Sequence, residues 1–311
     1  ITVLPAVVGG MTETDTLPYR DETVPIDRRV EDLLSRMALE EKVAQLESVP
    51  PRWMDVEDES EMAARLQLLD EDGDINEENA RELLSDSIGH FTRLAGGGGL
   101  EPETAARVTE RLQAIAIEQS RFDLAAIPHE ECLSGYMGPR GTTYPQGIGL
   151  ASTWDPELIE GMTARIREQL RAIGTHHALS PVLDVARDPR WGRTEETFGE
   201  DPYLVARMAA AFVDGLQGDD PEKGVSATLK HFAGHAVGEG GKNRSTVQIG
   251  EREFREVHLF PFEAAVTETD ADSVMNAYHD VDGVPCTADE WLLTDVLRGE
   301  WGFDGTVASD Y

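Results

Sequence analysis

The chain has 311 residues, with 60 Asp and Glu against 27 Lys and Arg, a formal net charge of −33 at pH 7. So negative a surface repels phosphate backbones and anionic lipid headgroups, which argues against nucleic-acid and membrane partners. Hydrophobic residues make up 40% of the chain, enough for a substantial core. Because molar salt shortens the Debye length to about 3 Å, we interpret the evenly spread acids as a halophilic surface, with an acidic low-salt protein as the alternative.

Cysteine content and apolar runs limit the class of protein further. Cys132 and Cys286 are the two cysteines, too few for a disulfide framework and without the spacing of a zinc site. We therefore expect no metal and no cofactor. No apolar run approaches the roughly 20 residues of a membrane helix, and the apolar start of the chain lacks preceding basic residues. These features predict a cytoplasmic protein, with secretion left open.

The first predicted element is an amphipathic helix over residues 30–46, in which apolar side chains recur three and four positions apart. An acidic segment, residues 55–82, follows it. Its acid spacing resembles a calcium-binding loop, but the turn glycine of such a loop would fall on Ile75 and its last glutamate on Arg81. We interpret this segment as solvated surface.

Further along the chain, short apolar runs alternate with helical patterns. Two helices have clear start signals, because Asp155 before Pro156 and Asp201 before Pro202 each place an N-cap carboxylate ahead of a first-turn proline. A terminal glycine, at 215 or 218, is expected to end the second of these helices. The apolar runs predict six strands: residues 87–91, 123–129, 177–185, 225–232, 271–278 and 305–311.

Strands that alternate with helices fit an open doubly wound sheet or a (β/α)8 barrel. The polar residues at the strand ends favour the barrel, in which all carboxyl ends face one mouth. No glycine-rich nucleotide fingerprint follows the first clear strand. The predicted fold class is therefore α/β, a TIM (β/α)8 barrel. The strand-end residues are Glu131, Asp184, Lys230, His231, Tyr278 and Asp310.

A loop after the third predicted strand is rich in arginine. Arg187, Arg190 and Arg193 fall within seven residues of a strongly acidic chain. Planar guanidinium groups bind the paired oxygens of vicinal hydroxyls or of a carboxylate. The alternative is that some of them fix the loop through ion pairs, with Glu195, Glu196 or Glu200 for the arginines, and with Asp184 for Arg187 or Arg190.

The sequence positions of four tryptophans indicate whether each belongs to the core or lies near a substrate. Trp154, Trp291 and Trp301 fall at helical spacing or at the start of strands, where an aromatic side chain belongs to the core more often than to a sugar platform. Trp191, within the arginine loop, is the better candidate to approach a substrate.

Six ordered motifs resemble glycoside hydrolase family 3, the β-glucosidase and β-xylosidase group. The resemblance implies a retaining β-glycosidase that hydrolyses terminal non-reducing β-D-glucosides or xylosides through a glycosyl-enzyme intermediate on Asp310. Its substrate-binding positions correspond to Glu131, Arg193, Lys230, His231, Arg244, Met275 and Tyr278. The motifs are YRDETVPIDRRVEDLLSRMALEEKVAQL, IPHEECLSGYMG, DPRWGRTEETFGEDP, KHFAGH, SVMNAYHDVDGVPC and WLLTDVLRGEWGFDGTVASDY.

A retaining mechanism needs two carboxyl groups about 5 to 5.5 Å apart. Nearby Lys230, Arg193 and protonated His231 would favour the ionised form of Asp310. The sequence shows no obvious second acid. In two-domain relatives this acid/base residue lies in a second α/β domain. We therefore expect residues 1–311 to be the N-terminal barrel domain of such an enzyme, truncated just after the nucleophile and completed by a missing domain or a complementing chain.

Two alternatives stay open. The single-domain β-N-acetylhexosaminidases of the family take their acid/base from an Asp and His pair in the loop after KHF, whereas GHAVGEGGKNRSTV has no such pair. The chain would otherwise be a non-catalytic sugar-binding barrel fragment. If the chain is a glycosidase of either kind, its expected partner is a β-linked oligosaccharide or glycoside.

Overall fold

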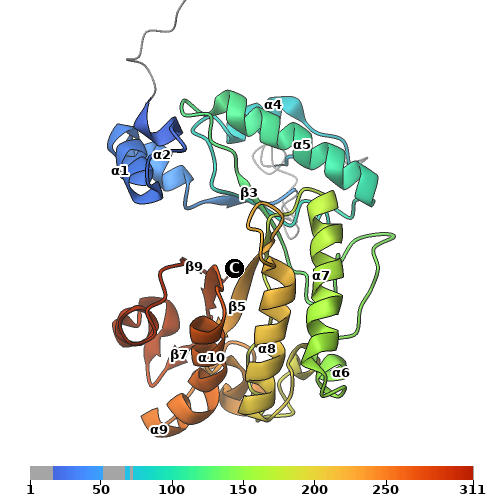
Figure 1. Cartoon of the computed structure of the whole chain (residues 1–311), viewed down its shortest axis with the longest axis vertical. Helices are drawn as coiled ribbons and strands as arrows, with labels where there is room; N and C mark the ends of the chain where they lie inside the picture. Colours follow the sequence, from blue (N-terminus) through green and yellow to red (C-terminus); the bar gives the residue numbers. More distant parts are fainter. Residues whose placement is uncertain (1–16, 52–66, 71–72, 311) are drawn as a thin grey trace, which may run out of the picture.

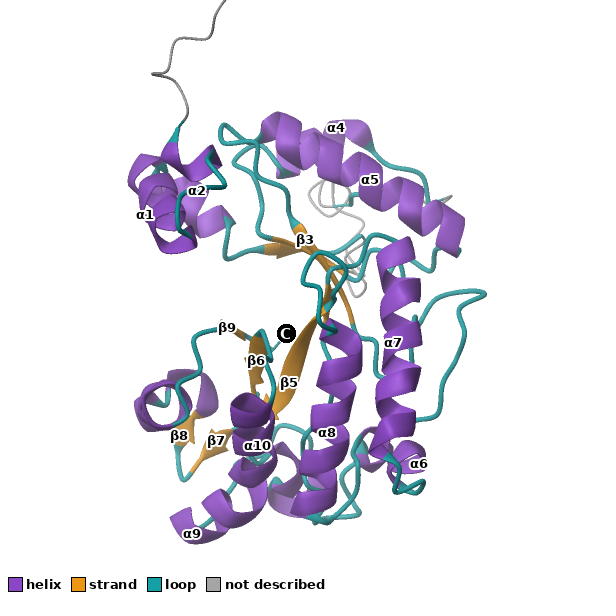
Figure 2. Ribbon diagram, viewed as in Figure 1, coloured by secondary structure: helices purple, strands orange, loops and turns teal. Residues whose placement is uncertain are grey.

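The computed structural model describes residues 17–51, 67–70 and 73–310. Seven strands form one parallel sheet in the order β1-β2-β3-β4-β5-β6-β9. Each strand pairs with the next one along the chain, and the sheet curls with helices packed against it as an incomplete α/β barrel (Figures 1 and 2). The strands are β1 (Ser48–Val49), β2 (His90–Thr92), β3 (Ile127–Glu130), β4 (His177–Ala178), β5 (Ser226–Phe232), β6 (Ser273–Asn276) and β9 (Thr306–Ala308).

Helices connect most of the successive strands. The α-helices are α1 (Ile26–Arg36), α2 (Leu39–Ala44), α4 (Glu77–Leu83), α5 (Pro102–Gln119), α6 (Gly147–Ala151), α7 (Pro156–Ala172), α8 (Pro202–Gln217), α9 (Glu251–Glu253) and α10 (Phe260–Glu268). The shorter or wider turns are η1 (Pro18–Arg20), η2 (Thr194–Glu196), η3 (His235–Val237), η4 (Glu239–Gly241), η5 (Phe254–Leu259), η6 (Cys286–Ala288) and η7 (Trp291–Glu300). No helix within the described ranges is long and apolar enough to cross a membrane.

All six predicted strands correspond to observed strands, and all six are shorter than predicted. The run 177–185 keeps only His177–Ala178 as β4. Pro181 lies in its middle and has no backbone N–H to donate, which interrupts the ladder. Beyond it, Val182 returns to the sheet as an isolated bridge to Lys230.

Two features were not predicted. The two-residue β1 is too short to produce a periodic pattern. A hairpin joins β7 (Asp280–Val281) to β8 (Val284–Pro285) through Asp282 and Gly283, which have φ values of 50° and 88°. Asp-Gly is a strong signal for such a turn, because both turn residues need positive φ.

The single helix predicted over 30–46 is wrong. The chain forms α1 and α2, separated by Met37 and Ala38 in extended conformation. Met37 turns inward to a small core with Tyr19 and Phe122, and the Glu41 carboxylate accepts a hydrogen bond from the Ala38 N–H at 2.7 Å. Burial and capping therefore override the periodic pattern.

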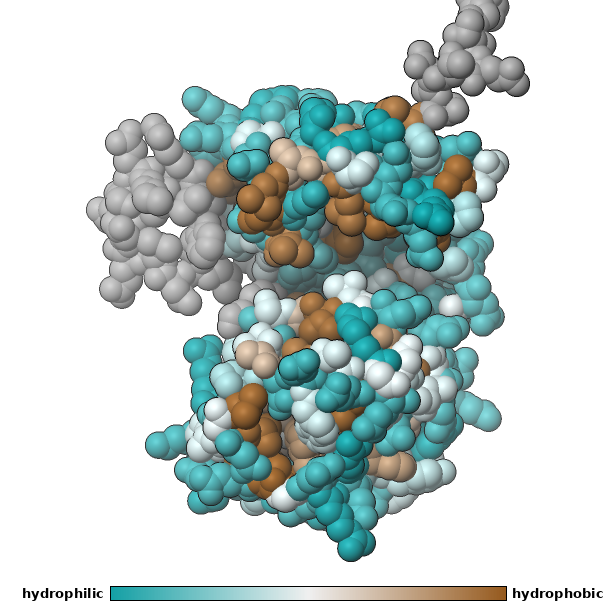
Figure 3. Space-filling view, turned by 90° about the vertical axis from the view of Figure 1, so that its left-hand side faces the viewer, coloured by the Kyte–Doolittle hydropathy of each residue, from teal (hydrophilic) through white to brown (hydrophobic). Residues whose placement is uncertain are grey.

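The outer faces of α1 and α2 leave apolar side chains in contact with solvent. They gather on the upper part of the molecule in Figure 3, above the hollow that separates this part from the lower one. This is unusual, because an amphipathic helix normally buries its apolar face against the core. Its side chains are Ile26, Val30, Leu34, Leu39, Val43 and Leu46.

Both predicted helix caps are present. Asp155 accepts a hydrogen bond from the Leu158 N–H at 3.1 Å, and Asp201 accepts one from the Leu204 N–H at 2.8 Å. The second helix, α8, ends at Gln217 and is followed by Gly218 at φ +63°. The positive φ favours glycine there, and a Cβ would also lie 1.9 Å from Arg167 Nη1, so the flexible end of that arginine would have to move.

The main core lies between the sheet and the helices α5, α7, α8 and α10, with Phe91, Phe212 and Phe262 among its fully buried side chains. Cys132 and Cys286 are buried and free. Much of the acidic segment 55–82 lies outside the described residues, and the structure places α4 in the remainder.

Candidate active site

The predicted site residues gather at the carboxyl edge of the parallel sheet. Glu131 directly follows β3, Met275 lies in β6, and Asp310 comes two positions after β9. Lys230 and His231 lie near the end of β5. Since the carboxyl ends of parallel strands meet at one edge, residues distant in sequence become neighbours there.

Asp310 lies against aromatic and basic groups. Its side chain is 6% exposed, and its Oδ2 is 3.9 Å from His231 Nε2. Tyr278 lies close to Asp310, and the Arg244 guanidinium lies over the Tyr278 ring, 4.6 Å from its centroid. Burial raises the pKa of Tyr278, and the negative charge of Asp310 adds to that rise. The structure therefore brings Arg244, Tyr278 and Asp310 together.

Arg193 is held from two sides. Its Nε and Nη2 donate to the two carboxylate oxygens of Glu196 at 2.9 and 2.7 Å, and Nη2 also donates to His231 Nε2 at 3.0 Å. Burial lowers the pKa of Arg193, but Glu196, then Asp184 and Asp310, outweigh it and the net shift is upward. Glu196 was one of the ion-pair partners considered from the sequence. The guanidinium is thus a fixed positive charge near Asp310.

His231 does not supply a second positive charge. Burial and the nearby charges of Lys230 and Arg193 hold its pKa well below the ordinary value. The expectation that protonated His231 would help to ionise Asp310 is therefore wrong. Its Nδ1 contacts Asp184 Oδ2 at 2.7 Å instead.

Lys230 and Glu131 form a second, adjoining pair. Lys230 Nζ donates to Glu131 Oε2 at 2.6 Å, and the lysine side chain is only 3% exposed. A buried ammonium needs such a partner, because desolvation of an unpaired charge is costly. The structure therefore places these two predicted sugar-binding residues side by side, and each side chain binds the other.

Glu130, the neighbour of Glu131, was not predicted. Its Oε1 accepts hydrogen bonds from the Ala95 and Gly96 N–H groups at 2.7 and 3.1 Å. Burial raises its pKa to about 7, although these two hydrogen bonds oppose the rise. Sequence alone could not single out Glu130. It lies next to another acid, Glu131, and the direction of each side chain depends on where the strand ends.

This arrangement was compared with known proteins. The sequence model described as the N-terminal domain of glycosyl hydrolase family 3 matches residues 38–311. The chain belongs to glycosyl hydrolase family 3. This confirms the family predicted from the six motifs.

Individual relatives agree with the family assignment. A β-xylosidase of Formosa agariphila is 47% identical over 201 residues, which are 61% of this chain and 28% of the relative. A periplasmic β-glucosidase of Salmonella typhimurium is 31% identical over 288 residues, covering 92% of this chain and 33% of the relative. The solved β-glucosidase of Erythrobacter marinus superposes with a TM-score of 0.80 at 36% identity, over 94% of this chain and 37% of its own.

The glycosyl hydrolase family 3 chain therefore spans about a third of the length of these relatives. The Salmonella relative is named as periplasmic. A cytoplasmic location for the present chain remains a prediction.

The arginine loop of this family 3 chain differs in part from its prediction. Arg190 pairs with Asp188, its Nη2 2.7 Å from Oδ2, on the surface. Asp184 pairs with His231 instead of with Arg187 or Arg190. Arg193 is thus the arginine of this loop that joins the network around Asp310.

The tryptophan assignments also need correction. Trp154 is 72% exposed, so its assignment to the core is wrong. Trp291 and Trp301 pack against the core, as predicted. Trp191 is 2% exposed, and its indole N–H donates to Asn243 at 2.9 Å. Buried in this way, it supports Arg193, whose guanidinium lies 5.7 Å from its ring centroid.

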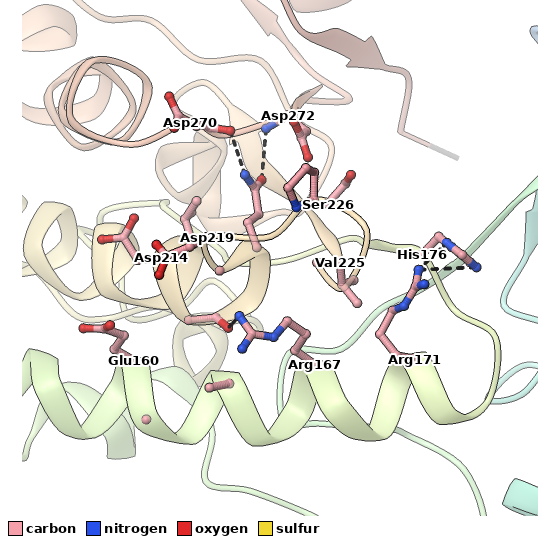
Figure 4. Close-up of a pocket in the computed structure, with 18 of the residues that line it drawn as sticks. Glu160, Arg167, Arg171, His176, Asp214, Asp219, Val225, Ser226, Asp270 and Asp272 are labelled. Atoms are coloured by element: carbon pink, nitrogen blue, oxygen red, sulfur yellow. Dashed lines mark hydrogen bonds between the residues drawn. The ribbon is translucent and has the colours of Figure 1, made fainter. Parts of the chain in front are cut away.

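Two cavities lie next to the strands. One, of about 810 Å³, runs along the sheet and is lined by Asp310 and Met275, together with His90, His129 and His177. The other predicted site residues are not part of its lining. The second, of about 1190 Å³, lies at the amino ends of β4, β5 and β6 and holds none of the predicted residues (Figure 4). In barrel enzymes the amino end serves stability, whereas the carboxyl end carries the chemistry.

Proposed function

We propose that this chain carries the nucleophile and sugar-binding side of a retaining β-glycosidase that acts on terminal β-D-glucosides or β-D-xylosides. Asp310 attacks the anomeric carbon and forms the glycosyl-enzyme intermediate. Glu131, Arg193, Lys230, His231, Arg244, Met275 and Tyr278 contact the sugar or shape its pocket. The relatives named β-xylosidase and β-glucosidase support these two substrate classes.

The setting of Asp310 is the observation that carries the proposal. A nucleophilic carboxylate must be ionised, oriented and largely shielded from water. Asp310 is 6% exposed, its Oδ2 lies 3.9 Å from His231 Nε2, and it is close to Tyr278 and to the positive charge of Arg193. The positive charge favours a carboxylate at this position.

We further propose that the acid/base residue comes from outside residues 1–311. Among the described residues, the carboxylates joined to this network are each bound to a partner: Glu131 to Lys230, Asp184 to His231 and Glu196 to Arg193. A carboxylate that is ion-paired, as Glu131 and Glu196 are, or that accepts hydrogen bonds, as Asp184 does from His231, is a poor proton donor, because its partner stabilises the charged form.

The test uses 2,4-dinitrophenyl 2-deoxy-2-fluoro-β-D-glucoside and the corresponding xyloside. Their leaving group departs without a proton donor, so they report on the nucleophile alone. We expect the folded chain, in molar KCl, to gain the mass of one fluorosugar, which peptide mapping places on Asp310. The reagent that labels faster identifies the preferred sugar.

Two variants provide the controls. Asp310→Asn is expected to abolish labelling, whereas Asp304→Asn, an exposed carboxylate in the same segment, is expected to label like the parent chain. Near-UV circular dichroism confirms that each is folded. Labelling of another carboxylate, or none on a folded parent chain, would show that these residues do not form the nucleophile's site.

A further inference from the structure

Asp184 is a buried carboxylate behind the residues already discussed. It follows β4 at the carboxyl edge of the sheet, and its side chain is 0% exposed. Its Oδ2 accepts two hydrogen bonds from one residue, His231: one from the backbone N–H at 3.0 Å and one from the ring Nδ1–H at 2.7 Å. Two bonds to the same residue fix the position of the imidazole as well as its orientation.

The contact at the opposite edge of the imidazole shows where its proton lies. Arg193 Nη2 contacts His231 Nε2 at 3.0 Å. A guanidinium group only donates hydrogen bonds, so Nε2 must accept with its lone pair. The proton therefore lies on Nδ1, facing Asp184. A single neutral tautomer satisfies both contacts, and a proton on Nε2 would place two N–H groups against each other.

Arg193 in turn lies close to Asp310, because both approach the same atom of His231: Arg193 Nη2 lies 3.0 Å and Asp310 Oδ2 lies 3.9 Å from His231 Nε2. Glu196 holds the guanidinium on one side, His231 holds it on the other, and the charge of Asp310 contributes to the raised pKa of Arg193. Without the acceptor at His231 Nε2, Glu196 alone would direct this guanidinium. The contacts form a continuous chain from Asp184 through His231 to Arg193.

We propose that Asp184 is a positioning residue: it holds His231 as the Nδ1–H tautomer, so that the Nε2 lone pair orients Arg193 beside Asp310. The effect on glycosyl transfer rests on the proposed function above. The tautomer and the orientation of Arg193 do not depend on it, and each can be measured separately.

A purely electrostatic role is the competing explanation. The second oxygen of Asp184, Oδ1, has no hydrogen-bond partner among the described residues. Burial lowers the pKa of His235, His258 and His279, and the charge of Asp184 partly opposes this in all three. If Asp184 only balanced charge within this histidine cluster, removing the charge would matter and the orientation of its oxygen would not.

Asp184→Asn and Asp184→Ala separate the two explanations. The backbone N–H of His231 can only donate, so the amide oxygen of asparagine takes the place of Oδ2 and still accepts from Nδ1–H. Asparagine therefore keeps the orientation and removes the charge. Alanine removes both. Asp188→Asn is the matched control, since Asp188 lies four positions further on and pairs with Arg190 on the surface.

Long-range proton–nitrogen NMR of the chain labelled with ¹⁵N-histidine reads the tautomer directly. Eight histidines give signals, and His231→Gln assigns the relevant one. We expect Nδ1–H at His231 in the parent chain, in Asp184→Asn and in Asp188→Asn, and a mixture of tautomers in Asp184→Ala. A proton on Nε2 or on both nitrogens in the parent chain overturns the proposal, even if Asp184→Ala does not fold. Loss of the tautomer in folded Asp184→Asn supports the electrostatic explanation instead and also overturns it.

The rate at which the fluoroglycoside labels Asp310 gives the functional consequence. A misdirected Arg193 is expected to slow labelling by about a hundredfold in Asp184→Ala, whereas Asp184→Asn stays within a few-fold of the parent and Asp188→Asn is unchanged. Equal slowing in Asp184→Asn and Asp184→Ala contradicts the positioning role. If no chain is labelled while the tautomers behave as stated, the proposed glycosidase function is wrong and the positioning of His231 stands.

Discussion

At the scale of single residues, Glu130 makes a specific contribution to the pH dependence of stability. Burial raises its pKa to about 7 in the folded chain, against 4.5 when unperturbed. The folded state therefore binds this proton more tightly than the unfolded state does. Its contribution is complete below pH 4.5 and is lost as the pH rises through 7, by about 3 kcal/mol at most.

Glu130→Gln is expected to remove this dependence. The amide oxygen still accepts from the Ala95 and Gly96 N–H groups, and no charge forms at high pH. Urea unfolding from pH 4.5 to 8 should show the parent chain losing free energy of unfolding relative to the variant. Buried His129 and His177, whose pKa values fall to about 3 and 4, act in the opposite direction below pH 6.5 but are common to both proteins.

Glu101→Gln, which removes an exposed partner of Arg140, is the control and should leave the profile unchanged. A difference between the parent chain and Glu130→Gln that stays constant with pH would mean that Glu130 is not protonated in the folded state.

The pairing of charged residues around Asp310 could be predicted from the sequence only in part. The motifs named the residues around Asp310, and the structure brings most of them together. They did not reveal which charge pairs with which. Arg193 finds Glu196 three positions away, a pair that local spacing suggests, whereas Asp184 finds His231 47 positions away. Only the packing of neighbouring strands determines such a distant pairing.

At the scale of elements, Asp201 is the N-cap of α8, a helix with one face buried throughout its length. Its carboxylate satisfies the Leu204 N–H, which has no partner within the helix. Asp201→Ala is expected to lower the free energy of unfolding by about 1 kcal/mol. Chemical unfolding measures this loss, and Asp201→Asn should restore most of it. An alanine variant as stable as the parent chain would show that solvent replaces this cap.

The sequence predicted helices and strands well where a single local signal was strong. A carboxylate followed by proline marked the starts of α7 and α8, and apolar runs located six strands. The errors arose where another feature competed with the local pattern. Met37 is drawn into the small core with Tyr19 and Phe122 and breaks a periodic helix, a tertiary contact that periodicity does not reveal. Pro181 interrupts an apolar run just after β4, because it has no backbone N–H to donate.

At the scale of the whole molecule, charge is the dominant feature. Even if each of the 27 basic residues neutralised one acid, 60 minus 27, or 33, carboxylates would remain unpaired. Salt weakens attraction within surface ion pairs, which contribute little individually, and it also weakens repulsion among the excess acids. Because the excess is larger than the number of possible pairs, the net effect of screening is expected to be stabilising.

We therefore expect the thermal midpoint of unfolding to rise between 0.1 M and 2 M KCl, as the Debye length falls from about 10 Å to below about 3 Å. Circular dichroism melts in KCl, NaCl and tetramethylammonium chloride provide the measurement. Simple screening predicts similar rises at equal ionic strength, whereas a specific ion site would favour one cation. Sucrose tests for general exclusion from the surface, which stabilises folded proteins without ions. Equal stability in dilute buffer and in molar KCl would contradict the halophilic interpretation, because repulsion among 33 excess charges would then be too weak to influence folding.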